Sequence, residues 1–114
     1  MTTKEFTKML DKNGEDRLRI RVKVEKGNLV DIMVQYESLI GGHWSAIVRY
    51  NMEHGFFHRD LLNPKGEKIK TSIEMPDLKT AAIYAEQDIK DKCEFYKEKF
   101  VKQIKHDKQR NGKS

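Results

Sequence analysis

Hydrophobic and polar residues alternate without a fault from Arg17 to Glu25, which predicts a β-strand with one buried face. The apolar positions are Leu18, Ile20, Val22 and Val24, and the polar positions are Arg17, Arg19, Arg21 and Lys23. A similar two-residue period returns in the segments 29–38, 43–51, 56–62 and 67–74, and turns containing Gly or Pro separate these segments. We therefore expect residues 16–74 to form an antiparallel meander sheet of four or five strands.

The period changes to that of a helix after Pro76, where Asp77 is a plausible N-cap. The apolar stripe comprises Leu78, Ala81, Ala82, Ala85, Ile89, Cys93, Tyr96, Phe100 and Ile104. This stripe predicts one long helix over residues 77–107, packed on one face of the sheet. At about 40 Å, such a helix exceeds the roughly 24 Å width of five strands, so one end should run past the sheet.

The two ends of the chain carry weaker patterns. Phe6, Met9 and Leu10 have helical spacing, but so short a helix is marginal, and residues 1–12 are expected to form an N-terminal arm or a short helix. Residues 108–114 are polar and basic, which favours a flexible tail. The whole chain, 1–114, is thus expected to be a single α+β domain.

Composition narrows the class of protein. The chain has 114 residues, 23 Lys+Arg against 18 Asp+Glu, 37% hydrophobic residues and one cysteine. One cysteine excludes an intrachain disulfide, and no apolar run approaches the roughly 20 residues of a membrane-spanning helix. We expect a cytoplasmic protein that does not interact with a membrane.

The excess of positive charge is confined to the C-terminal segment 97–114. Its basic residues are Lys97, Lys99, Lys102, Lys105, Lys108, Arg110 and Lys113, against Glu98 and Asp107, which accounts for the net charge of +5. A basic helix end of this kind can contact the phosphates of RNA or DNA. It is equally typical of a solvated terminus whose lysines suit the helix dipole.

The arginine row of the first predicted strand could extend such a basic surface. It could also protect an edge strand against aggregation. The candidate nucleic-acid-binding residues are Arg17, Arg19, Arg21, Lys102, Lys105, Lys108 and Arg110.

Side chains capable of catalysis gather in the predicted hairpin 49–60, which contains Arg49, His54, His58 and Asp60. A histidine as general acid and base, an arginine to hold a phosphate and a carboxylate to orient the histidine would suffice for metal-free RNA cleavage. With a four-residue loop, Arg49 would lie opposite His58.

Two other interpretations of the hairpin stay open. His54, His58 and Asp60 are possible metal ligands, but their spacing on a strand is poor, and we expect neither a metal nor a cofactor. Alternatively, these side chains form cross-strand hydrogen bonds and ion pairs and nothing more.

The aromatic residues are assigned mainly to the core. Trp44, Tyr50, Tyr96 and Phe100 fall on predicted core faces, whereas Tyr84 and Phe95 lie beside the helix stripe. This flank of the helix is a candidate surface for a second copy of the chain or another protein partner.

The positions Val48, Arg49, Tyr50, Asn51, His54, Gly55, His58, Arg59 and Asp60 carry a resemblance to known proteins. With the helix that follows, this pattern resembles a family of short uncharacterised prokaryotic proteins with a domain of unknown function, over nearly the whole chain. More distantly, the strand Arg49-Tyr50-Asn51 and the His-containing turn after it resemble a family of small toxins from toxin–antitoxin pairs. The first resemblance implies no activity, and the second implies an RNA-directed nuclease.

Three hypotheses follow. The chain is a nucleic-acid-binding module or a protein-interaction module that uses its long basic C-terminal helix, with neither of these favoured over the other. Alternatively, it is a small nuclease of toxin type with its centre in the hairpin 49–60.

Overall fold

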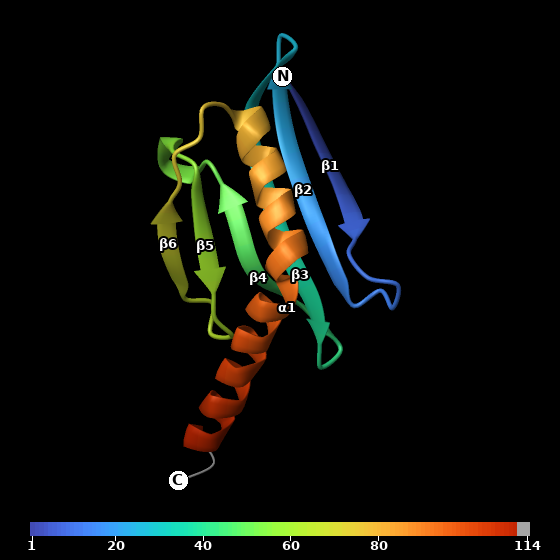
Figure 1. The fold of residues 1–114 in the computed structure, drawn as a ribbon, viewed down its shortest axis with the longest axis vertical. Coiled ribbons are helices and arrows are strands. Elements are labelled where there is room, and N and C mark those ends of the chain that lie inside the picture. Colours follow the sequence, from blue (N-terminus) through green and yellow to red (C-terminus); the bar gives the residue numbers. More distant parts are fainter. Residues whose placement is uncertain (112–114) are drawn as a thin grey trace.

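A computed structural model describes the backbone of residues 1–111 and the side chains of residues 1–108. Six strands form one antiparallel sheet in chain order, and a single long helix lies across one of its faces (Figure 1). The strands are β1 (Thr2–Met9), β2 (Asp16–Glu25), β3 (Asn28–Ile40), β4 (His43–Asn51), β5 (His58–Leu62) and β6 (Lys68–Ser72). A 3-10 turn, η1 (Glu53–Gly55), precedes β5, and the helix is α1 (Leu78–Asn111). The α+β class is confirmed, but the sheet has six strands rather than four or five.

The additional strand is β1, where the sequence suggested an arm or a short helix. Its residues Thr2 to Met9 pair antiparallel with Val24 to Arg17 of β2. Asp11 stabilises the connection by accepting hydrogen bonds from the backbone amides of Glu15 and Asp16, each at 3.1 Å. The ladder with β2 pairs one side of the backbone of this segment, whereas a helix of so few residues would be only marginally stable.

Helix α1 begins at Leu78, directly after the predicted N-cap residue Asp77. The Oδ1 atom of Asp77 accepts a hydrogen bond from the Thr80 amide at 2.7 Å, as an N-cap does. At the other end α1 continues to Asn111, so the predicted end at residue 107 was too early and residues 108–111 of the predicted tail are helical. Residues 112–114 of that tail lie outside the described residues.

The hydrophobic core lies between α1 and the middle of the sheet. Its buried members are Leu18, Ile20, Ile32, Val34, Tyr36, Ile47, Val48, Tyr50, Phe57, Ala81, Ala85, Ile89, Tyr96 and Phe100. The alanines of the helix allow α1 to approach the strands closely, while residues from β2, β3 and β4 supply most of the apolar volume. Within the described part of the chain, no helix is both long enough and apolar enough to cross a membrane.

A β-bulge reverses which side chains in the first part of β4 point toward the helix. The register between β3 and β4 shifts after Tyr36, which pairs with Val48, while the next residue, Glu37, pairs with Ala46. Ile47 is the extra residue, so the alternation reverses on its N-terminal side. Trp44 therefore lies on the face away from the helix, against Arg17, and its assignment to the core was wrong.

Candidate functional site

The face of the sheet opposite α1 carries an ordered polar cluster. Arg19 pairs with Gln35, Gln35 with Arg49, and Arg49 with Asp60, so these four residues form one row across four strands. In the next row Asn51 pairs with His58. Directly opposed residues of antiparallel strands project to the same face, so the pairing brings all of these side chains together.

Several of these side chains are buried although α1 covers the other face. His58 and Asp60 are 0% exposed, and Gln35, Glu37 and Asn51 are also buried. Long side chains of the same face cover one another, and an open hollow of about 800 Å³ beside them is lined by Arg19, Arg49 and Glu53, among others. Burial of this many polar groups is costly unless they are paired.

A chain of hydrogen bonds satisfies the β2–β3–β4 side of the cluster. Glu37 accepts from Arg17 Nε at 2.7 Å and from Gln35 Nε2 at 2.5 Å. Gln35 in turn accepts from Arg49 Nε at 2.6 Å. Arg49 therefore reaches toward β3, and it does not lie opposite His58 as predicted, because the connection spans residues 52–57 rather than four residues.

The β5 side of the cluster is less completely paired. His58 Nε2 lies 3.4 Å from Asp60 Oδ2, and Asn51 Nδ2 lies 3.4 Å from the same oxygen. His58 Nδ1 lies 3.1 Å from the backbone carbonyl oxygen of Phe56. Among the described residues, His58 Nε2 and Asp60 Oδ1 have no hydrogen-bond partner. The sequence correctly predicted that His58 and Asp60 lie on the same face of the strand, but it did not predict that both are buried.

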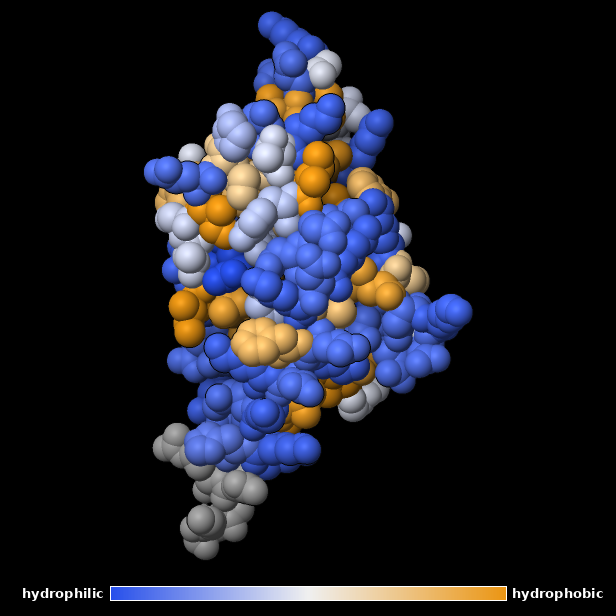
Figure 2. Space-filling view, in the orientation of Figure 1, coloured by the Kyte–Doolittle hydropathy of each residue, from blue (hydrophilic) through white to orange (hydrophobic). Residues whose placement is uncertain are grey.

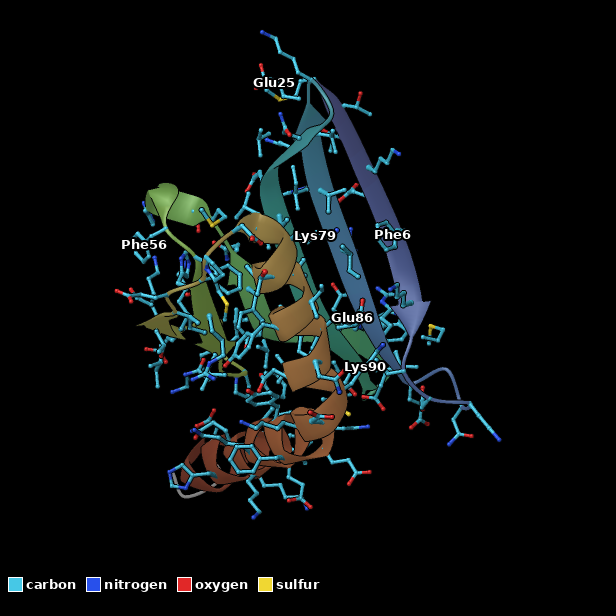
Figure 3. The ribbon with its side chains drawn as sticks, turned by 45° about the horizontal axis from the view of Figure 1, so that its top comes forward. Phe6, Glu25, Phe56, Lys79, Glu86 and Lys90 are labelled. Carbon is cyan, nitrogen blue, oxygen red and sulfur yellow. The ribbon has the colours of Figure 1, made fainter. Side chains whose placement is uncertain are left out.

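The turn before β5 contributes a different residue from the one expected. His54 is exposed in η1, with φ at 70°. Glu53 is the residue whose carboxylate approaches the pair, since ligand atoms of Glu53, His58 and Asp60 all lie within 4.8 Å of one another. Nothing in the sequence distinguished Glu53 from other acidic turn residues. Figure 3 shows Phe56 beside this turn, where its ring packs against His58.

The basic row of β2 is largely engaged within the sheet. Arg17 pairs with Glu37 and stacks on Trp44 at 3.7 Å, and Arg19 lies 3.5 Å from Glu37. The alternative interpretation of β2 as a charge-protected edge is wrong, because β1 pairs along its outer side. The edge is β1 itself, which Lys8 links to Glu86 on the flank of α1 shown in Figure 3.

The C-terminal part of α1 runs beyond the sheet (Figure 1). Lys102, Lys105 and Lys108 are exposed there, and Figure 2 shows this end of the molecule as predominantly hydrophilic. Lys97, nearer the sheet, lies 3.6 Å from Asp16. The backbone of Arg110 is helical, but its side chain lies outside the described residues.

A second polar cluster connects α1 to the sheet. Asp88 Oδ2 accepts hydrogen bonds from the hydroxyl groups of Tyr50 and Tyr96, each at 2.6 Å. Burial alone would raise the pKa of Asp88, but these bonds and Lys92 outweigh it, and the pKa is lowered. Burial and the bond to Asp88 raise the pKa of Tyr96 to about 12. The sequence pattern did not indicate Asp88, a single acid beside the apolar stripe.

Comparison with known proteins gives one match. The family model described as "Domain of unknown function (DUF7718)" matches residues 1–106, which includes the whole sheet and most of α1. No curated protein and no solved structure matches the chain.

Proposed function

The chain belongs to this DUF7718 family, and from its own geometry we propose that it is a nucleic-acid-binding module that contacts phosphates through the free end of α1. The observation that carries the proposal is a row of lysines, Lys99, Lys102, Lys105 and Lys108, at intervals of three residues, which starts beside the sheet at Lys99 and continues along the part of α1 that leaves it. Residues three apart are neighbours on a helix, and each is turned about 60° from the one before, so the four lysines form a row that winds about half-way around α1. We call these four residues the lysine ridge.

The composition of the free end favours a nucleic acid over a protein partner. Between residues 101 and 108 the side chains of Lys102, Gln103, Lys105, His106 and Lys108 are exposed, while Val101 and Ile104 are half-buried. A dimer or protein partner docked on this end alone would require a broader apolar surface than these two residues offer, since the exposed Tyr84 and Phe95 lie earlier in the helix. Phosphate contacts need positive charge and little apolar area, which this segment provides.

The sheet face is a poorer candidate for phosphate binding. The basic residues that line its hollow are Arg19, Arg21, Lys23 and Arg49, and the acidic ones are Glu5, Glu25, Asp31 and Glu53. The basic and acidic residues are equal in number, and Lys23 lies 3.9 Å from Asp31. A surface with no net charge gives little electrostatic attraction to a polyanion.

The test is the salt dependence of binding to a labelled RNA hairpin and to a DNA duplex, measured by fluorescence anisotropy. The variant K102E/K105E/K108E reverses three ridge charges, and K12E/K26E/K65E reverses three exposed turn lysines as a matched control. If all three ridge lysines contact phosphates, the slope of log K against log salt on duplex DNA falls by about 2.7 in the ridge variant. Equal losses in both variants would reject the ridge as the site.

The same proteins are also measured by sedimentation at micromolar concentration. A dimer of the wild-type chain that the ridge variant abolishes, with no nucleic-acid binding, would assign α1 to self-association and reject the proposal.

RNA cleavage of toxin type is a second candidate function, supported by the His58–Asp60 pair at 3.4 Å. Both side chains are fully buried, so a substrate would reach them only if the segment 53–56 moved. Labelled structured RNA is incubated with wild-type protein and with His58→Ala, with and without divalent metal. Cleavage by the wild type alone would support the nuclease, and its absence would exclude this activity on that substrate.

A further inference from the structure

We propose that Glu53, His58 and Asp60 form a binding site for one divalent transition-metal ion, with Zn²⁺ as the best-suited ion. This inference goes beyond nucleic-acid binding and involves a different part of the molecule. It also departs from the expectation of no metal, which rested on the poor spacing of His54, His58 and Asp60 and did not consider Glu53.

The orientation of the His58 ring supports the site. A backbone carbonyl only accepts hydrogen bonds, so the contact of Nδ1 with the Phe56 carbonyl at 3.1 Å requires the proton to be on Nδ1. In the neutral ring, Nε2 then carries a lone pair. Histidines that ligate metals are commonly oriented in this way, with the non-ligating nitrogen donating to a carbonyl.

His58 Nε2 faces a buried carboxylate, an arrangement that a bound cation would stabilise. The atom is fully buried, lies 3.4 Å from Asp60 Oδ2 and has no hydrogen-bond partner among the described residues. Asp60 Oδ1 is likewise buried and unpartnered. Two buried acceptors that face each other repel, and a metal ion bound between them removes the repulsion.

The distances fit a metal better than they fit a hydrogen bond. Ligand atoms about 2.1 Å from a tetrahedral Zn²⁺ are about 3.4 Å apart, which matches the separation of Nε2 and Oδ2. An N–H···O bond would be shorter, at roughly 2.7–3.2 Å. The Glu53 carboxylate is within 4.8 Å of both partners and is exposed, so a small side-chain movement completes three ligands.

The ligand set also indicates the class of ion. One imidazole and two carboxylates suit Zn²⁺ and similar transition metals, whereas Ca²⁺ and Mg²⁺ prefer oxygen ligands alone. The charged neighbours are Lys68, 4.0 Å from Glu53, and Arg49 and Lys70, which flank Asp60 in the adjoining strands. Lys68 is half-exposed and free to turn away, and Arg49 donates from Nε to Gln35.

The experiment is isothermal titration calorimetry of metal-free protein with Zn²⁺, together with thermal unfolding at increasing Zn²⁺. We expect one ion per chain in the wild type and a rise in Tm. Glu53→Gln, at an exposed position, should weaken binding by at least tenfold, and His58→Asn should abolish it. His54→Ala is the matched control, since this exposed neighbour lies outside the three ligands and should bind as the wild type does.

Three results would overturn the proposal. They are no heat and no Tm shift in the wild type, unchanged affinity in Glu53→Gln, or a loss of binding in His54→Ala as large as in His58→Asn. If His58→Asn does not fold, Glu53→Gln and His54→Ala decide. Titration with Mg²⁺ tests the class of ion, and binding as tight as that of Zn²⁺ would reject the assignment to a transition metal.

Discussion

Replacing Asp88 with asparagine tests how much the Asp88 carboxylate stabilises the packing of α1 on the sheet. Both tyrosine hydroxyls donate to Asp88 Oδ2 at 2.6 Å, and the asparagine keeps the shape while removing the charge. A hydrogen bond to a charged group contributes about 1.5–3 kcal/mol and a neutral one about 0.5–1.5 kcal/mol, so each bond should lose roughly 1–1.5 kcal/mol. Asp88→Asn should therefore lower the free energy of unfolding by about 2–3 kcal/mol at pH 7.

The assay is urea unfolding followed by far-ultraviolet circular dichroism. With a typical slope for a small domain, the midpoint should fall by about 1–2 M urea. The same substitution is then made in Tyr50→Phe/Tyr96→Phe, where the two donors are absent, and there it should cost less than about 0.5 kcal/mol. The ion pair with Lys92, at 3.4 Å and with a largely exposed lysine, contributes little in either background.

The pH dependence gives an independent check. Because the pKa of Asp88 is lower in the folded state than its ordinary value of 3.8, its stabilisation is present above that value and is lost as the pH falls through the folded-state pKa. The difference between wild type and Asp88→Asn should therefore shrink on going from pH 7 to pH 2. An equal cost of the substitution in both backgrounds, or a difference independent of pH, would refute the reasoning.

Three further predictions concern other side chains. Since the pKa of Tyr96 is raised to about 12, the free energy of unfolding measured in urea should decline as the pH rises above the ordinary tyrosine pKa of 10, and this decline should be smaller in Tyr96→Phe. Arg17→Ala should shift the fluorescence of Trp44 and lower the free energy of unfolding by about 2 kcal/mol, because it removes a stacked cation and a donor to the buried Glu37 carboxylate. Arg21→Ala is the control and should change neither quantity by much. Burial raises the pKa of the Cys93 thiol, so alkylation should be slow in native protein and fast in urea; equal rates would contradict its packing.

The sequence predicted those strands in which apolar and polar residues alternate, including β6, whose residues are all exposed. Leu18 and Ile20 of β2 are buried as the alternation required, and Asp77 caps the helix. β1 was not recognised, because its apolar residues Phe6 and Met9 are three apart, which is the spacing of a helix. Its pairing depends on the backbone of β2, which leaves no periodic signal in the side chains.

The sequence indicated His58 and Asp60 of the candidate site, but neither Glu53 nor the residues that lie across the sheet from them. His58 and Asp60 share a face because they are two residues apart on one strand, a relation that any strand preserves. Which residues lie opposite one another in β4 and β5 depends on the length of the connection 52–57. A four-residue loop would place His58 opposite Arg49, whereas the observed register places Asp60 there. The extra residue Ile47 had a similar effect on Trp44, since no local pattern announces a bulge.

The sequential order of the strands also bears on how the protein is made. Each strand pairs only with its neighbours along the chain, so the sheet can form one hairpin at a time as the chain leaves the ribosome. The helix that covers the apolar face is synthesised after all six strands. Until α1 arrives, buried residues such as Ile32 and Val48 have no cover, and the growing sheet is open to aggregation or to binding by a chaperone. Synthesis of the last third of the chain thus determines how long that exposure lasts.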